Sequence, residues 1–186
     1  MRRSLLALST VALVVLSTTL SAQARRPAAP PRSGGFSMGY TDIGPTIGLG
    51  NLGGASIDFG GRFEHAIKAL PDMGNGILGI QASAEYYSWS GVGWSYKYIP
   101  IGVTGNYHFK LDDPKLDPFV GLGLGYNVVS CSYSGLGGNF GCGYSSGIYF
   151  IGRAGGRYFF SPNMSAYADV GAGAATLSLG IMFKIM

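Results

Sequence analysis

The sequence has few charged residues for its length. Only 12% of its 186 residues are Asp, Glu, Lys or Arg, against roughly 25% in a typical soluble protein. So few charged residues are unusual for a protein whose whole surface meets water, and they argue against a basic surface that binds nucleic acid. We therefore expect no nucleic-acid partner.

Long apolar runs are also absent beyond residue 24. No such segment approaches the roughly 20 apolar residues of a membrane-spanning helix. The chain has instead 32 glycines and 12 tyrosines. A closed β-barrel is the other structure that satisfies every backbone polar group in lipid, so this composition favours strands in a membrane.

The first 24 residues have the organisation of an export signal. Arg2 and Arg3 precede an apolar run over residues 5–16, which is followed by the small-x-small pattern Ala22-Gln23-Ala24. We predict a cleaved signal peptide over residues 1–24; the alternative is a single transmembrane anchor, which would need a longer apolar core. Residues 25–35 are rich in proline and glycine and are predicted to form a flexible tail.

From Phe36 onward the sequence alternates in the period-two pattern of β-strands. In the clearest case, Ile99, Ile101 and Val103 alternate with small or polar residues. Eight segments share the pattern: 42–50, 55–65, 78–87, 96–110, 119–130, 148–160, 164–172 and 176–185. Eight is the smallest usual strand number of outer-membrane barrels. We predict an all-β fold over residues 36–186, an eight-stranded antiparallel transmembrane up-and-down β-barrel.

The apolar face of these strands is predicted to meet lipid. Its aromatic residues gather at two levels, as in the girdles that flank a membrane: Phe63, Tyr107, Phe109, Tyr158, Phe160 and Phe183 at one, and Tyr86, Tyr126 and Phe150 at the other. The alternative is a soluble lipocalin-like barrel, whose polar face would meet water. The few charges and many glycines of the polar face disfavour that alternative.

The polar face then lines the lumen. It carries five acidic and four basic residues: Asp42, Asp58, Arg62, Glu64, Glu85, Arg153, Arg157, Asp169 and Lys184. Side chains fill the interior of an eight-stranded barrel, and isolated charges are costly there. We interpret the set as a packed network of paired polar side chains; the alternative is a narrow ion path.

Two cysteines, Cys131 and Cys142, fall in the longest predicted outer connection, residues 131–143. In an exported chain such a pair favours a disulfide, which would stabilise the fold by roughly 3 kcal/mol on the chain-entropy model. No Cys-x-x-Cys motif is present, so we expect a structural bond rather than redox catalysis.

Candidate catalytic residues are scarce. Neither His65 nor His108 is predicted to lie beside a serine and an acid at the outer rim, and no metal-ligand spacing is present. Residues 121–125 alternate glycine and leucine without a nucleotide-binding order, so we interpret these glycines as making room in a narrow lumen. We expect no enzyme activity, no cofactor and no metal.

Two segments resemble the small outer-membrane β-barrel family that includes the OmpA-like and OmpW-like barrels. Residues 98–109 form a proline-bearing strand that ends in aromatic residues, and residues 117–126 follow as a Pro-aromatic strand that alternates with glycine. The resemblance implies the outer membrane of a Gram-negative bacterium and contact with its lipid and lipopolysaccharide. It also implies assembly by periplasmic chaperones and the barrel-assembly machinery.

The leading hypothesis for function is a structural or surface-interaction role in the cell envelope. It rests on the filled lumen and on the Cys-closed outer loop, which carries Tyr133 and Phe140. The alternative is a narrow pore for small or apolar solutes, as the OmpW-like resemblance implies, with the glycine row of residues 121–125 leaving a cavity. An envelope enzyme has no catalytic constellation to support it, and no surface ligand follows from the sequence.

Export should remove residues 1–24 and leave a mature chain of 162 residues (186 − 24) that begins at Arg25. The intact mass of protein recovered from the membrane fraction measures this. An uncleaved chain would contradict the prediction and favour the membrane anchor.

Overall fold

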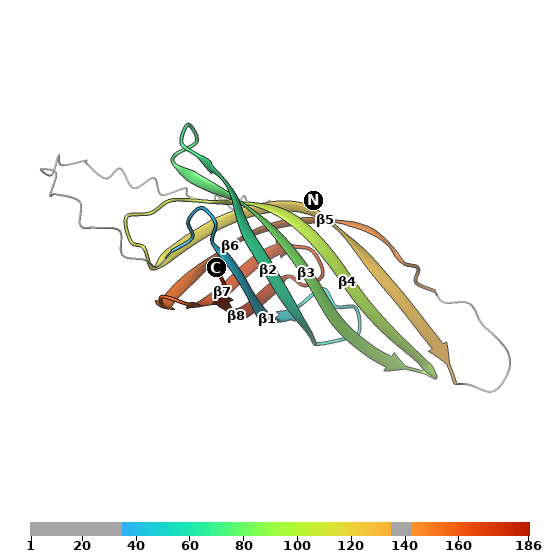
Figure 1. Cartoon of the computed structure of the whole chain (residues 1–186). Coiled ribbons are helices and arrows are strands. Elements are labelled where there is room, and N and C mark those ends of the chain that lie inside the picture. The colour runs from blue at the N-terminus through green and yellow to red at the C-terminus, as the bar shows by residue number, and fades with distance from the viewer. Residues whose placement is uncertain (1–34, 135–142) are drawn as a thin grey trace, which may run out of the picture. The chain divides into compact units, whose positions relative to one another are not determined.

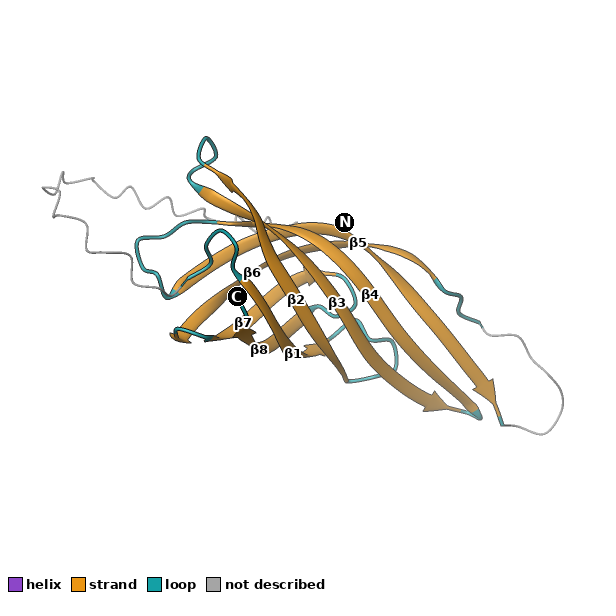
Figure 2. Cartoon of the chain, viewed as in Figure 1, coloured by secondary structure: helices purple, strands orange, loops and turns teal. Residues whose placement is uncertain are grey.

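The protein is a closed barrel of eight antiparallel strands in a computed structural model that describes residues 35–134 and 143–186. Figures 1 and 2 show the strands following one another around the barrel. Their bounds are β1 Thr41–Leu49, β2 Ile57–Leu70, β3 Gly76–Gly91, β4 Trp94–His108, β5 Leu116–Tyr133, β6 Gly147–Ser161, β7 Met164–Ala172 and β8 Leu177–Lys184. The predicted fold class is confirmed. The described residues include no helix long and apolar enough to cross a membrane.

Each strand pairs with its neighbour in the chain, and β1 pairs with β8 to close the sheet. We call the end with the connections β1–β2, β3–β4, β5–β6 and β7–β8 the loop end. The opposite end, which holds residues 35–40 and the C-terminus, is called the terminal end. The wall is uneven, because β3, β4 and β5 have 16, 15 and 18 residues, whereas β1, β7 and β8 have 9, 9 and 8. The long strands therefore project beyond the short ones at the loop end (Figure 1).

The two faces of the sheet have the composition expected from the alternation. Large apolar residues are exposed on the outer face: examples are Phe59 at 60%, Leu122 at 78% and Phe150 at 81% exposure. Polar residues at the alternate positions point inward and are buried, as at Asp42 and Thr46 of β1. This is inverted relative to a water-soluble barrel, in which the polar face meets the solvent.

The connection between β3 and β4 is shorter than expected, because the segments predicted as strands, 78–87 and 96–110, left residues 88–94 to a loop. The strands continue as a ladder until Gly91 pairs with Trp94. Only Val92 and Gly93 remain in the turn, with φ of 47° and 80°. Positive φ at both central residues is typical of the type I′ turn, whose twist matches that of a hairpin. The loop prediction was wrong because serine and glycine in this segment resemble a turn, although the aromatic residues between them keep the strand alternation.

Strand β5 is longer than the expected residues 119–130 at both of its ends. Asp117, expected in a connection, is a buried strand residue. Cys131, expected in the outer loop, lies in β5 and pairs in register with Tyr96. Its predicted partner Cys142 lies outside the described residues, as do the signal peptide and residues 25–34 of the predicted tail, so these features stay predictions.

The inward glycines of β5 are covered by neighbouring chain. A Cβ atom built on Gly125 would lie 2.3 Å from the Tyr149 ring, and one built on Gly123 would lie 2.0 Å from the Val103 carbonyl oxygen. Real Cβ contacts are not found at such distances, so only glycine permits this close approach. The glycine row therefore does not leave the cavity that the pore alternative required of it.

Substituting Gly123→Ala should destabilise the barrel by about 1–3 kcal/mol, because the new methyl group collides with backbone rather than with a movable side chain. The matched control is Gly105→Ala, since a Cβ atom there meets nothing within 4 Å. Urea unfolding of both variants in the same micelles measures the difference. Equal stability of the two would show that the β4–β5 spacing is not as tight as described.

Candidate functional site

The barrel interior contains the buried charges of the described residues. Six acidic side chains and three arginines are buried there, together with His108: Asp42, Asp58, Glu64, Glu85, Asp117 and Asp169, with Arg62, Arg153 and Arg157. They come from β1, β2, β3, β4, β5, β6 and β7. Because charge without a partner is costly in a low-dielectric interior, their mutual geometry decides what the lumen can do.

Arg157 is the centre of the network toward the terminal end. Its side chain is fully buried and lies against three carboxylates. Its Nε is 3.1 Å from Oδ2 of Asp42, one Nη is 3.0 Å from Oδ2 of Asp117, and the other Nη contacts Glu64. The guanidinium presents five donors in a rigid fork, so a single arginine can bind three acids from three strands.

His108 connects two of these acids. Its Nε2 is 2.9 Å from Oε1 of Glu64, and its Nδ1 is 2.9 Å from Oδ1 of Asp117. Glu64 also accepts hydrogen bonds from Asn106 Nδ2 at 2.9 Å and from Gln81 Nε2 at 3.2 Å. This carboxylate is thus held from β3, β4 and β6 together, which ties distant parts of the wall to one point.

A second group of ion pairs lies nearer the loop end. Arg62 contacts Asp169 and Tyr167, donates to Ser178 Oγ at 2.9 Å, and has Glu85 at 3.7 Å. Arg153 lies 2.9 Å from Oδ1 of Asp169 and donates to the Ala175 carbonyl oxygen at 2.9 Å. The side chain of Asp169 therefore bridges two arginines, and the β7–β8 turn is fastened to the network through its backbone.

Aromatic side chains close the terminal end. Phe36 stacks on His108, with ring centroids 3.6 Å apart, and its ring lies 5.1 Å from the Arg157 guanidinium carbon. Tyr40 is buried and packs edge-on against Phe159 at 5.9 Å. Burial raises the pKa of the Tyr40 phenol, which stays neutral. Residues 36–40 were expected to belong to the barrel, and they enter its terminal end ahead of β1.

An open cavity of about 490 Å³ lies at the loop end, and we call it the vestibule. Its polar lining includes Asn51, Tyr87, Asn127, Ser145 and Tyr149, and none of its described lining residues is charged. Beneath it, the space around Arg62, Glu85 and Arg153 has a volume of only about 10 Å³. One water-sized probe needs about as much, so the vestibule has a filled floor.

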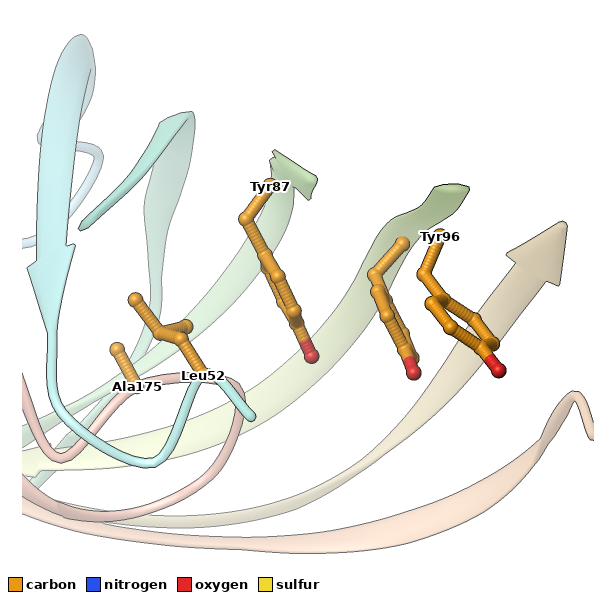
Figure 3. Close-up of a cluster of buried hydrophobic side chains, with 5 residues drawn as sticks. Leu52, Tyr87, Tyr96 and Ala175 are labelled. Carbon is orange, nitrogen blue, oxygen red and sulfur yellow. The ribbon is translucent and has the colours of Figure 1, made fainter. Parts of the chain in front are cut away.

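Stacked aromatic rings on β3 and β4 rise beside the vestibule; we call Tyr87, Trp89, Trp94, Tyr96 and Tyr98 the aromatic ladder. The Tyr87 and Tyr98 rings are parallel within 8° at 4.7 Å, and Trp89 and Tyr96 lie 4.4 Å apart. Figure 3 shows Tyr87 and Tyr96 projecting from their strands in the same direction, with Leu52 and Ala175 to one side. Offset and stacked pairs at these separations are favourable for aromatic rings.

Eight of the nine lumen residues expected from the sequence are buried inside the barrel, and the ninth, Lys184, lies half-buried at the terminal end. Its Nζ is 5.5 Å from the Tyr40 ring centroid. Asp58 faces Gly48 on the neighbouring strand, where a Cβ atom would meet its carboxylate at 2.3 Å. Among the remaining eight, ion pairs join Arg62, Arg153 and Arg157 to four of the acids.

Several network residues were missing from the expected set. Asp117 was expected in the connection that precedes residue 119, but it lies at an inward strand position. His108 was expected to point inward, as it does, but it was not included among the lumen residues. Gln81, Asn106 and Tyr167 also share the inward parity of their strands and complete the hydrogen bonding. The strand alternation predicts the inward position of these residues once uncharged polar residues are counted together with the charged ones.

Comparison with solved structures finds outer-membrane barrels. The outer membrane protein OprG from Pseudomonas aeruginosa aligns with a TM-score of 0.53 at 13% identity, over 82% of this chain and 98% of OprG. The chain has the fold of the small outer-membrane barrels. The barrel domain of P. aeruginosa OprF aligns at 0.48 and 18% identity over 80% and 98%. Ail of Yersinia pestis, solved with the heparin analogue sucrose octasulfate, aligns at 0.48 and 13% over 78% and 93%. No protein-family model and no curated protein matches the sequence.

Substituting Arg157→Met should destabilise the barrel by about 3–5 kcal/mol, because it leaves three buried carboxylates without their counter-charge. Lys184→Met is the matched control, since it removes a long cation at the rim and should change stability by no more than about 0.5 kcal/mol. Unfolding in urea, followed by tryptophan fluorescence in micelles, measures both. A small effect of the Arg157 substitution would mean that the network does not hold the barrel together.

Proposed function

We propose that this chain is an outer-membrane barrel of a Gram-negative bacterium with a structural or surface-interaction role, and that it is not an enzyme. The observation that carries the proposal is the filled interior. The ion-pair network and the ring of Phe36 occupy the lumen below the vestibule, so the chain offers a rigid wall rather than a passage.

The outer face supports the membrane part of this proposal. Exposed apolar residues surround the described barrel, and soluble proteins rarely expose apolar patches larger than a few hundred Å². Exposed Phe63, Tyr158, Phe160 and Phe183 gather toward the terminal end, while Tyr86 and Tyr126 lie toward the loop end. Such bands of aromatic residues flank the lipid-facing zone of outer-membrane barrels. Lipid and lipopolysaccharide are the proposed partners of this surface.

The proposed route to the membrane is export by a cleaved signal peptide, followed by assembly with periplasmic chaperones and the barrel-assembly machinery. If the terminal end faces the periplasm, the loop end lies at the opposite side of the membrane, outside the cell. A disulfide between Cys131 and Cys142 would stiffen the connection after β5 in that oxidising compartment. Blocking free thiols in non-reduced mature protein tests this bond, and two labelled cysteines would exclude it.

The folded mature protein should be electrically silent in a planar lipid bilayer, because a charge-filled interior leaves no continuous water path. Single-channel recording measures this, with a porin under the same conditions as the positive control. The double substitution Arg62→Ala and Arg153→Ala should enlarge the space below the vestibule but leave the terminal half closed, so it should stay silent too. Reproducible openings of the unmodified protein would overturn the proposal and favour the narrow pore.

Membrane insertion is tested separately by gel mobility. Protein refolded in micelles should migrate differently before and after boiling, because the hydrogen-bonded barrel resists the detergent until it is heated. Identical mobility would count against a membrane barrel whatever the conductance.

A further inference from the structure

The loop end of the barrel has no charged connections. Residues 50–56, 88–95, 131–147 and 172–177 contain no Asp, Glu, Lys, Arg or His. The connections of the terminal end, by contrast, carry Asp72, Lys110 and three further charged residues, Asp112, Asp113 and Lys115, and Lys68 lies close by in the last turn-proximal residues of β2. This asymmetry makes the loop end unsuited to binding by ion pairs, the mode that a sulfated or phosphorylated ligand would need.

The vestibule offers hydrogen-bonding groups without charge. Amide groups of Asn51 and Asn127 and hydroxyl groups of Tyr87, Ser145 and Tyr149 line it. The Oδ1 atom of Asn127 is buried and has no hydrogen-bond partner among the described residues. A buried acceptor without a partner is costly unless something fills the site. The volume of about 490 Å³ lies within the range of small-molecule sites, roughly 300–1,000 Å³.

The aromatic ladder extends the same surface outward. From Tyr87 at the vestibule it continues through Tyr98 to Tyr96, on which both Trp89 and Trp94 stack, and the ring centroids of these pairs are between 4.4 and 6.5 Å apart. Four residues separate Tyr87 from the hairpin turn, which corresponds to about 13 Å of strand. Trp89 and Trp94 are only partly buried, and Tyr144, whose ring packs edge-on against Tyr96 at 5.4 Å, is exposed at 55%.

We propose that the vestibule and the aromatic ladder together bind a neutral carbohydrate. A sugar ring has an apolar face of C–H groups, which suits the electron-rich face of an aromatic ring. Its hydroxyl edge both donates and accepts hydrogen bonds, as uncharged amides and phenols do. Few other ligand classes need aromatic faces, neutral polar groups and the absence of charge at once. This inference rests on the proposed surface role, for which it specifies the ligand.

Two other ligand classes fit this end of the barrel less well. An acidic polysaccharide would require cations on the inner surface. Lys97 lies at an exposed, outward position of β4, and Arg62 and Arg153 are buried below the floor and paired with Asp169. A purely apolar ligand would leave the buried Asn127 Oδ1 without a hydrogen-bond partner. Both classes are therefore included in the test as competitors.

The chain carries its own reporter for this test. Its two tryptophans, Trp89 and Trp94, both belong to the aromatic ladder, so intrinsic fluorescence reports on the site alone. Mature protein folded in micelles of a detergent without a sugar headgroup is titrated with an array of neutral oligosaccharides, including cellobiose, maltotriose and chitotriose. A heparin-derived tetrasaccharide and cyclohexanol, neither of which fluoresces, serve as the acidic and apolar probes.

The variants exploit the alternation of β3. Tyr87→Leu removes an inward ring of the ladder, and Tyr86→Leu removes the neighbouring ring, which is exposed at 44% on the outer face. We expect Tyr87→Leu to weaken binding by about three- to tenfold, and Tyr86→Leu to leave the affinity unchanged. Because Tyr87 is buried, Asn127→Leu provides a second test at a partly exposed position, and it should weaken binding without loss of the folded gel band.

Saturable changes in fluorescence with neutral sugars, reduced in both inward variants, would support the proposal. It would be overturned if only the heparin probe binds with strong salt dependence, or if only cyclohexanol binds. It would equally be overturned if no neutral sugar binds to protein whose heat-modified gel band shows a folded barrel. In that last case a silent bilayer recording leaves the structural role of the barrel standing, whereas channel openings would remove both proposals.

Discussion

The burial of the Arg157 guanidinium among three carboxylates is the constraint on which the terminal half of the barrel depends. Neither the arginine nor Asp42, Glu64 and Asp117 can reach water, so each is tolerable only while the others are in place. Because these residues come from β6, β1, β2 and β5, the electrostatic requirement is satisfied only when the sheet is closed. The network thus favours one strand register and one pairing of β1 with β8. The apolar residues of the outer face would not specify this register, because they can replace one another in contact with lipid.

The loop half is built on a different principle. Its wall is high only along β3, β4 and β5, and there the inward positions change from charged residues to stacked rings. Leu52 and Ala175, which come from the turns of the short strands, are buried against the same cluster (Figure 3). Aromatic stacking stabilises a projecting sheet without charges that would each need a partner. The unequal strand lengths and the aromatic ladder are therefore two aspects of one arrangement.

The alternation of inward and outward residues along each strand explains why much of this structure follows from the sequence. The period-two alternation predicts the strand number and which face meets the interior, because neighbouring residues of a strand must face opposite ways. It does not fix where strands end: Ser88, Ser90 and Gly91 resemble a turn, yet hydrogen bonding continues through them to Trp94. Nor does it place the ring of Phe36 on His108, since that contact depends on where a segment outside the sheet enters the closed barrel.

The position of the charges connects the two halves. An anionic ligand that reached Arg62 and Arg153 would compete with Asp169 for them, and it would weaken the ion pairs that form the floor of the vestibule. A neutral ligand leaves those ion pairs intact and meets a floor whose geometry is already set, which reduces the ordering cost of binding. The ion pairs lie below the vestibule floor, and the uncharged polar groups line the vestibule above it. The interactions that close the barrel are therefore separate from those available to a ligand. On this argument the uncharged loop end follows from the same electrostatic constraint that fills the lumen.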